Sequence, residues 1–207
     1  MTTTNPNPSA TPANVTVSVS ANASWLVIDT ATPVAVVGVV RGGRVLAEHV
    51  LSETKKHAEG LVDAIDRALL AAGLGLDEIG GVGVGRGPGS FIGVRTGIAT
   101  AKGICLGRRV PLVGIPTLVA LAHSAELPDG AGFAVIDAKR GEVFAQLVAS
   151  SAGVLKAIEP PSALSPQAFA ERARAVSFVV GDVADLDLTT AGSKHVALRA
   201  PSVHGLG

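Results

Sequence analysis

The chain has 207 residues with 17 basic and 17 acidic side chains, so its formal net charge at neutral pH is zero. A general electrostatic attraction to nucleic acid is therefore not expected of the isolated chain. A single cysteine excludes an internal disulfide and a cysteine-based zinc site. Hydrophobic residues make up 47% and aromatic residues 3%, which predicts an extensive core of aliphatic side chains.

Residues 1–24 are interpreted as a disordered leader. Up to Ala23 they carry no charged side chain and are rich in Thr, Asn, Pro, Ser and Ala. They lack the basic start and the long apolar stretch of a secretory signal peptide. The longest apolar candidate for a membrane span, residues 110–122, is interrupted by Pro111 and Pro116 and is too short. Together with the single cysteine, these features predict a cytoplasmic protein.

Ordered structure is expected from Trp25 onward. The continuous apolar run from Trp25 to Ile28 is typical of a strand buried on both faces, and it ends at Asp29. Residues 34–40 and 44–51, separated by a glycine pair, predict two further strands. The three strands form a meander with Asp29 at the end of the first.

Residues 55–73 predict an amphipathic helix, because apolar side chains recur every three or four positions. Leu61, Ile65 and Ala68 lie on this apolar stripe. Residues 79–84 then form an apolar run with interspersed glycines, which predicts a strand.

A glycine turn, residues 85–91 with the sequence GRGPGSF, leads into a second helix at residues 92–106. Ser90 is a plausible N-cap, and the start of a helix can attract an anion. The turn lacks the Lys-Ser or Lys-Thr of a Walker A loop, the third glycine of a dinucleotide fingerprint and the first glycine of a nucleophile elbow. Phosphate binding therefore stays an open interpretation.

Small residues recur at every fourth position of the second helix: Gly93, Gly97, Ala101 and Cys105. A glycine inside a soluble helix costs about 1 kcal/mol relative to alanine, so close packing is expected in return. Two interpretations remain open. The strip packs against the helix at residues 55–73 of the same chain, or it forms an interface with another protein.

The second half of the chain repeats the pattern of the first. A strand at residues 110–114 and a short helix from Pro116 end the first lobe, residues 25–125. After a polar linker, the second lobe covers residues 131–207. Its opening strand, ending at Asp137, aligns with the strand that ends at Asp29, and each is followed by a short turn and a second strand. Such a repeat indicates a duplicated unit.

Two α/β lobes of this kind suggest the duplicated actin-like, ribonuclease H-like fold of sugar kinases and Hsp70-type ATPases. In members that hydrolyse ATP, the turn after each first strand carries glycines that admit phosphates. Here the turn at residues 29–32 has no glycine, and the turn at residues 137–141 carries Lys139 and Arg140. We therefore predict a degenerate nucleotide site, although the two cations could still hold an anion.

The run from Gly87 to Arg95, GPGSFIGVR, closely resembles the GPGSFTGLR signature of the TsaB (YeaZ) family. Ile92 stands where the family has threonine. The resemblance covers residues 25–150 and includes the strand ending at Asp29 and the segment Ile136–Arg140. The signature residues in this chain are Gly87, Pro88, Gly89, Ser90, Phe91, Gly93 and Arg95.

The resemblance implies a non-catalytic subunit of the bacterial machinery that forms threonylcarbamoyladenosine beside the tRNA anticodon. Its partners would be TsaD, a paralogue of the same fold that carries out the transfer, and the ATPase TsaE, with tRNA bound through the complex. No cofactor is implied in this subunit, since ATP and metal belong to the partners. The metal pair H-x-x-x-H of TsaD-like proteins is incomplete here, because Leu61 follows His57.

In this family the partner is bound through helices of the N-terminal lobe. The interface predicted here combines the apolar stripe of the first helix with the small-residue strip of the second: Leu61, Ile65, Ala68, Gly93, Gly97 and Ala101. Homodimerisation of the isolated chain stays open. Two alternative functions are an ATPase or kinase of the actin-like fold and, less favoured, a glycoprotease-type peptidase, for which Ser90 has no sequence-adjacent base.

Overall fold

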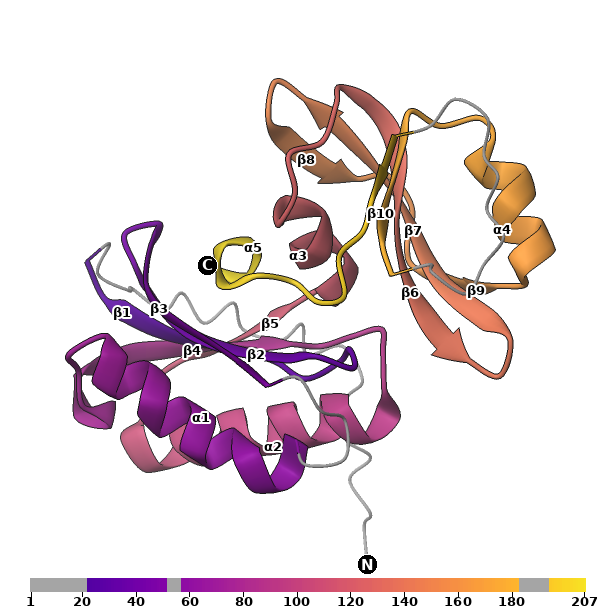
Figure 1. The fold of residues 1–207 in the computed structure, drawn as a ribbon. Helices are drawn as coiled ribbons and strands as arrows, with labels where there is room; N and C mark the ends of the chain where they lie inside the picture. Colours follow the sequence, from indigo (N-terminus) through magenta and orange to yellow (C-terminus); the bar gives the residue numbers. More distant parts are fainter. Residues whose placement is uncertain (1–21, 52–56, 183–193) are drawn as a thin grey trace, which may run out of the picture.

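The computed structural model describes residues 22–51, 57–182 and 194–207. Nearly all of the predicted leader, and the first two residues of the predicted first helix, lie outside the described residues. The first lobe is built on a five-stranded sheet in the order β3-β2-β1-β4-β5 (Figure 1). Its first three strands form the predicted antiparallel meander, whereas β4 pairs in parallel with β1 and β5 with β4. The bounds are β1 Ser24–Asp29, β2 Ala35–Arg41, β3 Arg44–Leu51, β4 Ile79–Gly85 and β5 Leu112–Ile115.

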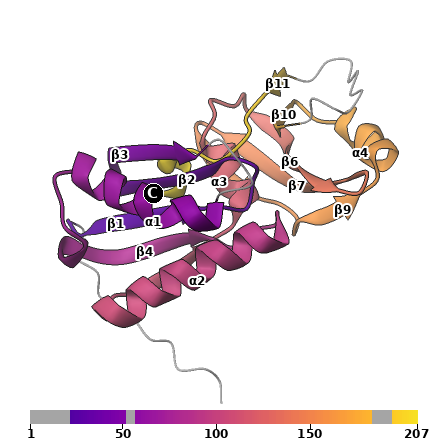
Figure 2. The ribbon, with the colours of Figure 1, turned by 60° about the horizontal axis from the view of Figure 1, so that its bottom comes forward.

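Helices α1 (His57–Ala71) and α2 (Phe91–Arg108) lie side by side on one face of this sheet (Figures 1 and 2). Successive residues of a strand point to opposite faces, so Leu26 and Ile28 of β1 both face these helices and are fully buried. A short 3-10 turn, Leu76–Glu78, joins α1 to β4. The two predicted helices are therefore present, with ends that differ by one or two residues.

The second sheet repeats the topology of the first. Its central strand β6 (Gly130–Lys139) pairs antiparallel with β7 (Glu142–Ser151) and parallel with β10 (Phe178–Gly181), as β1 pairs with β2 and β4. The order is β11-β10-β6-β7-β8, and β9 also pairs with β7. The remaining bounds are β8 Val154–Ala157, β9 Ser162–Leu164, β11 Lys194–Val196 and α4 Pro166–Ala173. The predicted duplication of an actin-like unit is thus present in the order and direction of the strands.

Two short helices cross between the lobes. Helix α3 (Thr117–His123) follows the first sheet, yet its Leu118 and Leu121 are buried against strands of the second. Helix α5 (Val203–Leu206) follows the second sheet, and its apolar side chains pack on β1 and β2 of the first (Figure 1). The sequence predicted that residues 131–207 all belong to the second lobe, whereas the last helix packs on the first sheet.

Strands β9 and β11 and helix α5 were not predicted. Each has only three or four residues, which is too short for a period of two or 3.6 to be recognised. Of the helices in the part of the chain that the structure describes, none has the length and apolar character that a membrane span requires.

Candidate functional site

The signature turn joins β4 to α2 at the edge of the first sheet. Ser90 is the N-cap residue of α2, and its hydroxyl accepts a hydrogen bond of 3.3 Å from the amide of Gly93. This confirms the predicted cap and satisfies one of the free amides of the first helical turn. The hydroxyl of Ser90 therefore has a structural partner within its own helix.

The turn between β1 and β2 lies directly against the start of α2. Ser90 N donates to the carbonyl of Ala31 at 2.7 Å, and the Thr30 hydroxyl donates to the carbonyl of Gly93 at 2.7 Å. A Cβ atom at Gly93 would lie 1.9 Å from Thr30 O, and one at Gly97 would lie 2.4 Å from Thr30 Oγ1. The first two small residues of the strip are thus explained by the β1–β2 turn, a neighbour that neither open interpretation included.

Asp29, at the end of β1, is a buried junction between three segments. Its carboxylate accepts hydrogen bonds of 2.8 Å from Ala31 N and from the Thr117 hydroxyl. Thr117 Oγ1 in turn accepts from the amide of Gly87 at 3.2 Å. Burial raises the pKa of Asp29 to about 6, although both hydrogen bonds act to lower it. Asp29 therefore holds together β1, the signature turn and the start of α3.

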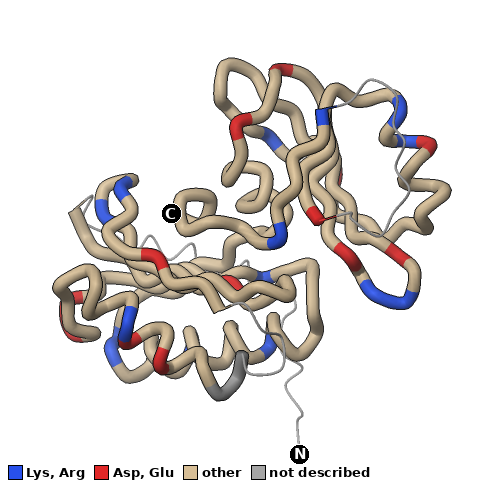
Figure 3. The backbone as a smooth tube through the Cα atoms, viewed as in Figure 1, with Lys and Arg blue, Asp and Glu red and all other residues tan. Residues whose placement is uncertain are grey.

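The corresponding turn of the second lobe is exposed, and basic side chains lie at the tip of its β6–β7 hairpin (Figure 3). Lys139 N donates to Asp137 Oδ1 at 2.6 Å, and the Lys139 ammonium pairs with Oδ2 at 2.5 Å. Partial burial would raise the pKa of Asp137, but the hydrogen bonds and charge of Lys139 outweigh it and hold the pKa below its ordinary value. One of the two cations that could hold an anion is thus already engaged. Among the described residues, no cluster of three or more His, Cys, Asp or Glu side chains could hold a metal.

The six residues of the predicted partner interface all lie inside the first lobe. Leu61, Ile65, Ala68 and Ala101 belong to the core between the helices and the sheet. Gly93 and Gly97 are buried against Thr30. The structure therefore corrects this set, because side chains in the core cannot contact a partner without unfolding the lobe. The signature residues Phe91 and Arg95 are exposed, with the Arg95 guanidinium 4.9 Å from the centre of the Phe91 ring.

The outward faces of the same two helices carry other apolar residues. On α2 these are Ile92, Ala99, Gly103 and Leu106, which fall on one line of the helix and are defined here as the outer stripe. Ile92 is 75% exposed and Leu106 is 81% exposed. On α1, Val62 and Leu70 are also exposed. Sequence reasoning missed these positions, although the signal was present: they are apolar residues outside the stripe that the core requires.

Several known proteins resemble this chain in sequence. The model of the family "TsaD: tRNA N6-adenosine threonylcarbamoyltransferase" matches residues 44–191. The Escherichia coli K12 protein named "tRNA threonylcarbamoyladenosine biosynthesis protein TsaB" is 36% identical over 155 residues, which cover 73% of this chain and 67% of that protein. The chain belongs to the TsaB (YeaZ) family.

Further relatives support this assignment. TsaB of Haemophilus influenzae is 36% identical over 130 residues, covering 61% of this chain and 55% of that protein. The solved structure of YeaZ from Pseudomonas aeruginosa matches with a TM-score of 0.72 and 25% identity, covering 89% of this chain and 88% of that one. The sequence match to the Haemophilus protein thus spans just over half of its length. Membership of the TsaB family accounts for the duplicated fold and for the signature turn.

Proposed function

We propose that this protein is a partner-binding subunit of the machinery that forms threonylcarbamoyladenosine on tRNA, and that it binds a TsaD protein through the outward faces of α1 and α2. The observation that carries the proposal is the outer stripe of α2, apolar and solvent-exposed over four turns. Large exposed apolar patches on a protein surface mark interaction sites. Tracing the stripe in Figure 2 shows that the whole length of α2 is accessible along the surface of the lobe.

The stripe suits a partner helix. Nothing lies within 4 Å of a Cβ atom built on Gly103, and Ala99 stands one turn before it. Small residues four apart allow another helix backbone to approach closely, while Ile92 and Leu106 at the two ends supply apolar area. Each of these larger side chains gains about 1.5–3 kcal/mol when it is fully buried. The polar residues Arg95 and Lys102 flank the stripe and would form the rim of the interface.

The first lobe favours a binding role over chemistry of its own. The β1–β2 turn, where an actin-like ATPase admits phosphate, is filled by contacts with α2. The Asp29 carboxylate is engaged by Ala31 and Thr117. These contacts support the proposal that ATP, metal and the transfer reaction belong to the partner subunits TsaE and TsaD. The proposal places the complex, with its tRNA, in the cytoplasm.

Calorimetric titration with TsaD tests the interface. Leu106→Asp puts a charge at one end of the stripe and should weaken binding by at least about tenfold, or about 1.4 kcal/mol. Gly103→Leu enters open space in the isolated chain and should weaken binding by a similar factor. Val154→Asp, at a position on β8 that is 58% exposed, is the matched control and should leave affinity unchanged.

The design separates a lost interface from a lost fold. Circular dichroism should show that all three variants unfold as cooperatively as the parent chain, because none of the three residues belongs to a buried core cluster. Unchanged TsaD affinity in both Leu106→Asp and Gly103→Leu would contradict the proposed surface. Loss of binding in Val154→Asp would show that the effect does not come from the stripe.

A further inference from the structure

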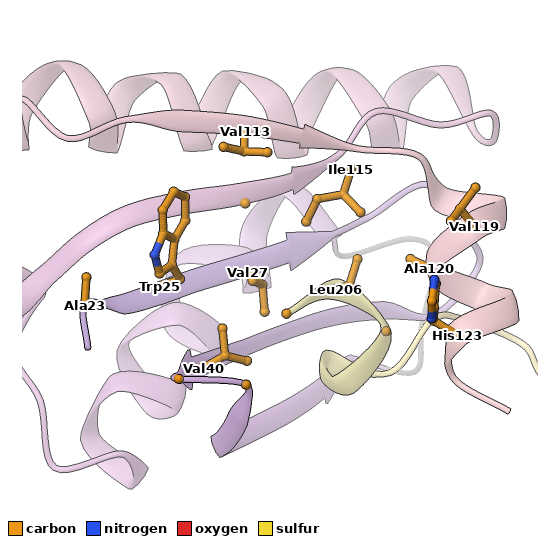
Figure 4. Close-up of a pocket in the computed structure, with 15 residues that line it drawn as sticks. Ala23, Trp25, Val27, Val40, Val113, Ile115, Val119, Ala120, His123 and Leu206 are labelled. Carbon is orange, nitrogen blue, oxygen red and sulfur yellow. The ribbon is translucent and has the colours of Figure 1, made fainter. Parts of the chain in front are cut away.

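A pocket opens on the face of the first sheet that points away from α1 and α2. Its volume is about 610 Å³, and its walls come from β1, β2, β4 and β5 together with both crossing helices (Figure 4). Pockets of about 300–1,000 Å³ at the junction of two lobes are the usual sites of small-molecule binding. The pocket shares no residue with the outer stripe, so a ligand bound in it is independent of the proposed partner surface.

Alternating glycines in β4 create the floor of this pocket. The strand reads IGGVGVG, and Val82 and Val84 belong to the core beneath α1 and α2. Gly81 and Gly83 therefore point to the opposite face. The indole of Trp25 lies over Gly81, where a Cβ atom would be 2.6 Å from the ring. Gly83 lines the pocket beside it, with no side chain to fill the space.

The walls are aliphatic and come from both halves of the molecule. Val113 of β5 stands on one side and is 48% exposed, while Val119 of α3 and Leu206 of α5 close the other (Figure 4). Because α3 is anchored in the second sheet and α5 in the first, a bound molecule would contact elements that hold the lobes together. Binding should therefore stabilise the whole chain against unfolding.

The chemistry of the lining selects for an uncharged ligand. Among the described residues, none of those that line the pocket carries a carboxylate, an amino group or a guanidinium, and the imidazole of His123 stands at one end (Figure 4). A charge placed here would lose its hydration without gaining a counter-ion. The indole offers an aromatic surface against which a flat ring can pack. We propose that this pocket binds a small uncharged molecule built on one or two fused aromatic rings.

Fluorescence offers a direct test, because Trp25 is the single tryptophan of the chain. The neutral dye N-phenyl-1-naphthylamine is titrated into the full chain while Trp25 is excited. Binding in the pocket should quench Trp25 and produce energy transfer to the dye. The anionic dye 1-anilinonaphthalene-8-sulfonate has the same ring system plus a sulfonate, and it should bind at least about tenfold more weakly.

Two variants locate the site. Val113→Glu and His123→Glu place a carboxylate on opposite sides of the pocket, and each should weaken binding of the neutral dye at least about tenfold. Both positions are exposed, so the fold should survive, which a thermal unfolding curve checks. Val154→Glu on β8 puts the same charge on an exposed valine of the other lobe and should leave binding within about twofold of the parent.

Three outcomes would overturn the proposal. The first is the absence of energy transfer from Trp25, and the second is equal affinity for the neutral and the anionic dye. The third is a dye affinity that falls as the protein concentration rises, because a second copy of the chain would then be covering the pocket. Tight binding of the neutral dye that is lost in Val113→Glu and in His123→Glu, and kept in Val154→Glu, supports it.

Discussion

The hydroxyl of Thr117 donates a hydrogen bond of 2.8 Å to the fully buried carboxylate of Asp29, 88 residues earlier in the chain. The same hydroxyl accepts from the amide of Gly87 at 3.2 Å, and Thr117 N donates to the carbonyl of Gly87 at 3.1 Å. Thr117 is the first residue of the helix that crosses into the second lobe. One side chain therefore connects the first strand, the signature turn and the junction between the lobes.

Replacing Thr117 by valine should destabilise the chain by about 1–3 kcal/mol. Valine keeps the shape of threonine, but it leaves the Asp29 carboxylate and the Gly87 amide each short of a partner in a buried site. Urea denaturation measures the loss. Thr117→Ser keeps the hydroxyl and should recover most of the stability, and equal stability of the valine variant and the parent would contradict the role assigned to this bond.

The raised pKa of Asp29 predicts a specific pH dependence of stability. In the folded chain burial raises this pKa from 3.8 to about 6, so the folded state binds the proton more tightly than the unfolded state. This contribution to stability is fully present below about pH 4, and it is lost as the pH rises to 6 and beyond. A shift of about two units corresponds to a loss on the order of 3 kcal/mol.

The substitution Asp29→Asn isolates this contribution, since the amide does not titrate. The difference in unfolding free energy between the parent chain and Asp29→Asn should move in favour of the variant between pH 4 and pH 7. Urea denaturation at several pH values measures it. A difference that stays constant across this range would show that the carboxyl of Asp29 titrates normally.

Two glycines of the same helix should respond in opposite ways to alanine. A Cβ atom at Gly93 would lie 1.9 Å from Thr30 O, so Gly93→Ala must displace the β1–β2 turn and destabilise the lobe. Gly103 has open space around it, and Gly103→Ala should stabilise the chain by up to about 1 kcal/mol through helix propensity. Thermal unfolding of the two variants compares them directly, and destabilisation of similar size in both would contradict the packing of Gly93 against Thr30.

Much of the first lobe could be predicted from the sequence because its elements are long and periodic. The apolar run before Asp29, the stripe containing Leu61 and Ile65, and the glycine turn each predicted the right element. The repeat around Asp137 predicted the second sheet for the same reason. Helix α5 and strand β11 were missed, because so few residues are held by contacts far away in the chain rather than by a local pattern.

The site was predicted less well than the fold. Small residues on α2 indicate close packing, but they do not say which neighbour approaches, and Thr30 lies 63 residues before Gly93. The apolar stripe of α1 faces the sheet, as such stripes usually do, so the partner surface must be sought among the apolar residues left over. Leu70 and Leu106 are such residues. The link from Thr117 to Asp29 has no local signal at all.

The central claim is that this chain assists a catalytic partner through the outer stripe of α2. The most direct measurement is the rate at which TsaD and TsaE, supplied with ATP, carbonate and threonine, modify tRNA in the presence of this chain, in its absence, and with Leu106→Asp in its place. The account predicts modification only when the parent chain is present, and at least about a tenfold lower rate with the variant at limiting protein concentration. Full activity without this chain, or modification of tRNA by this chain alone, would contradict it.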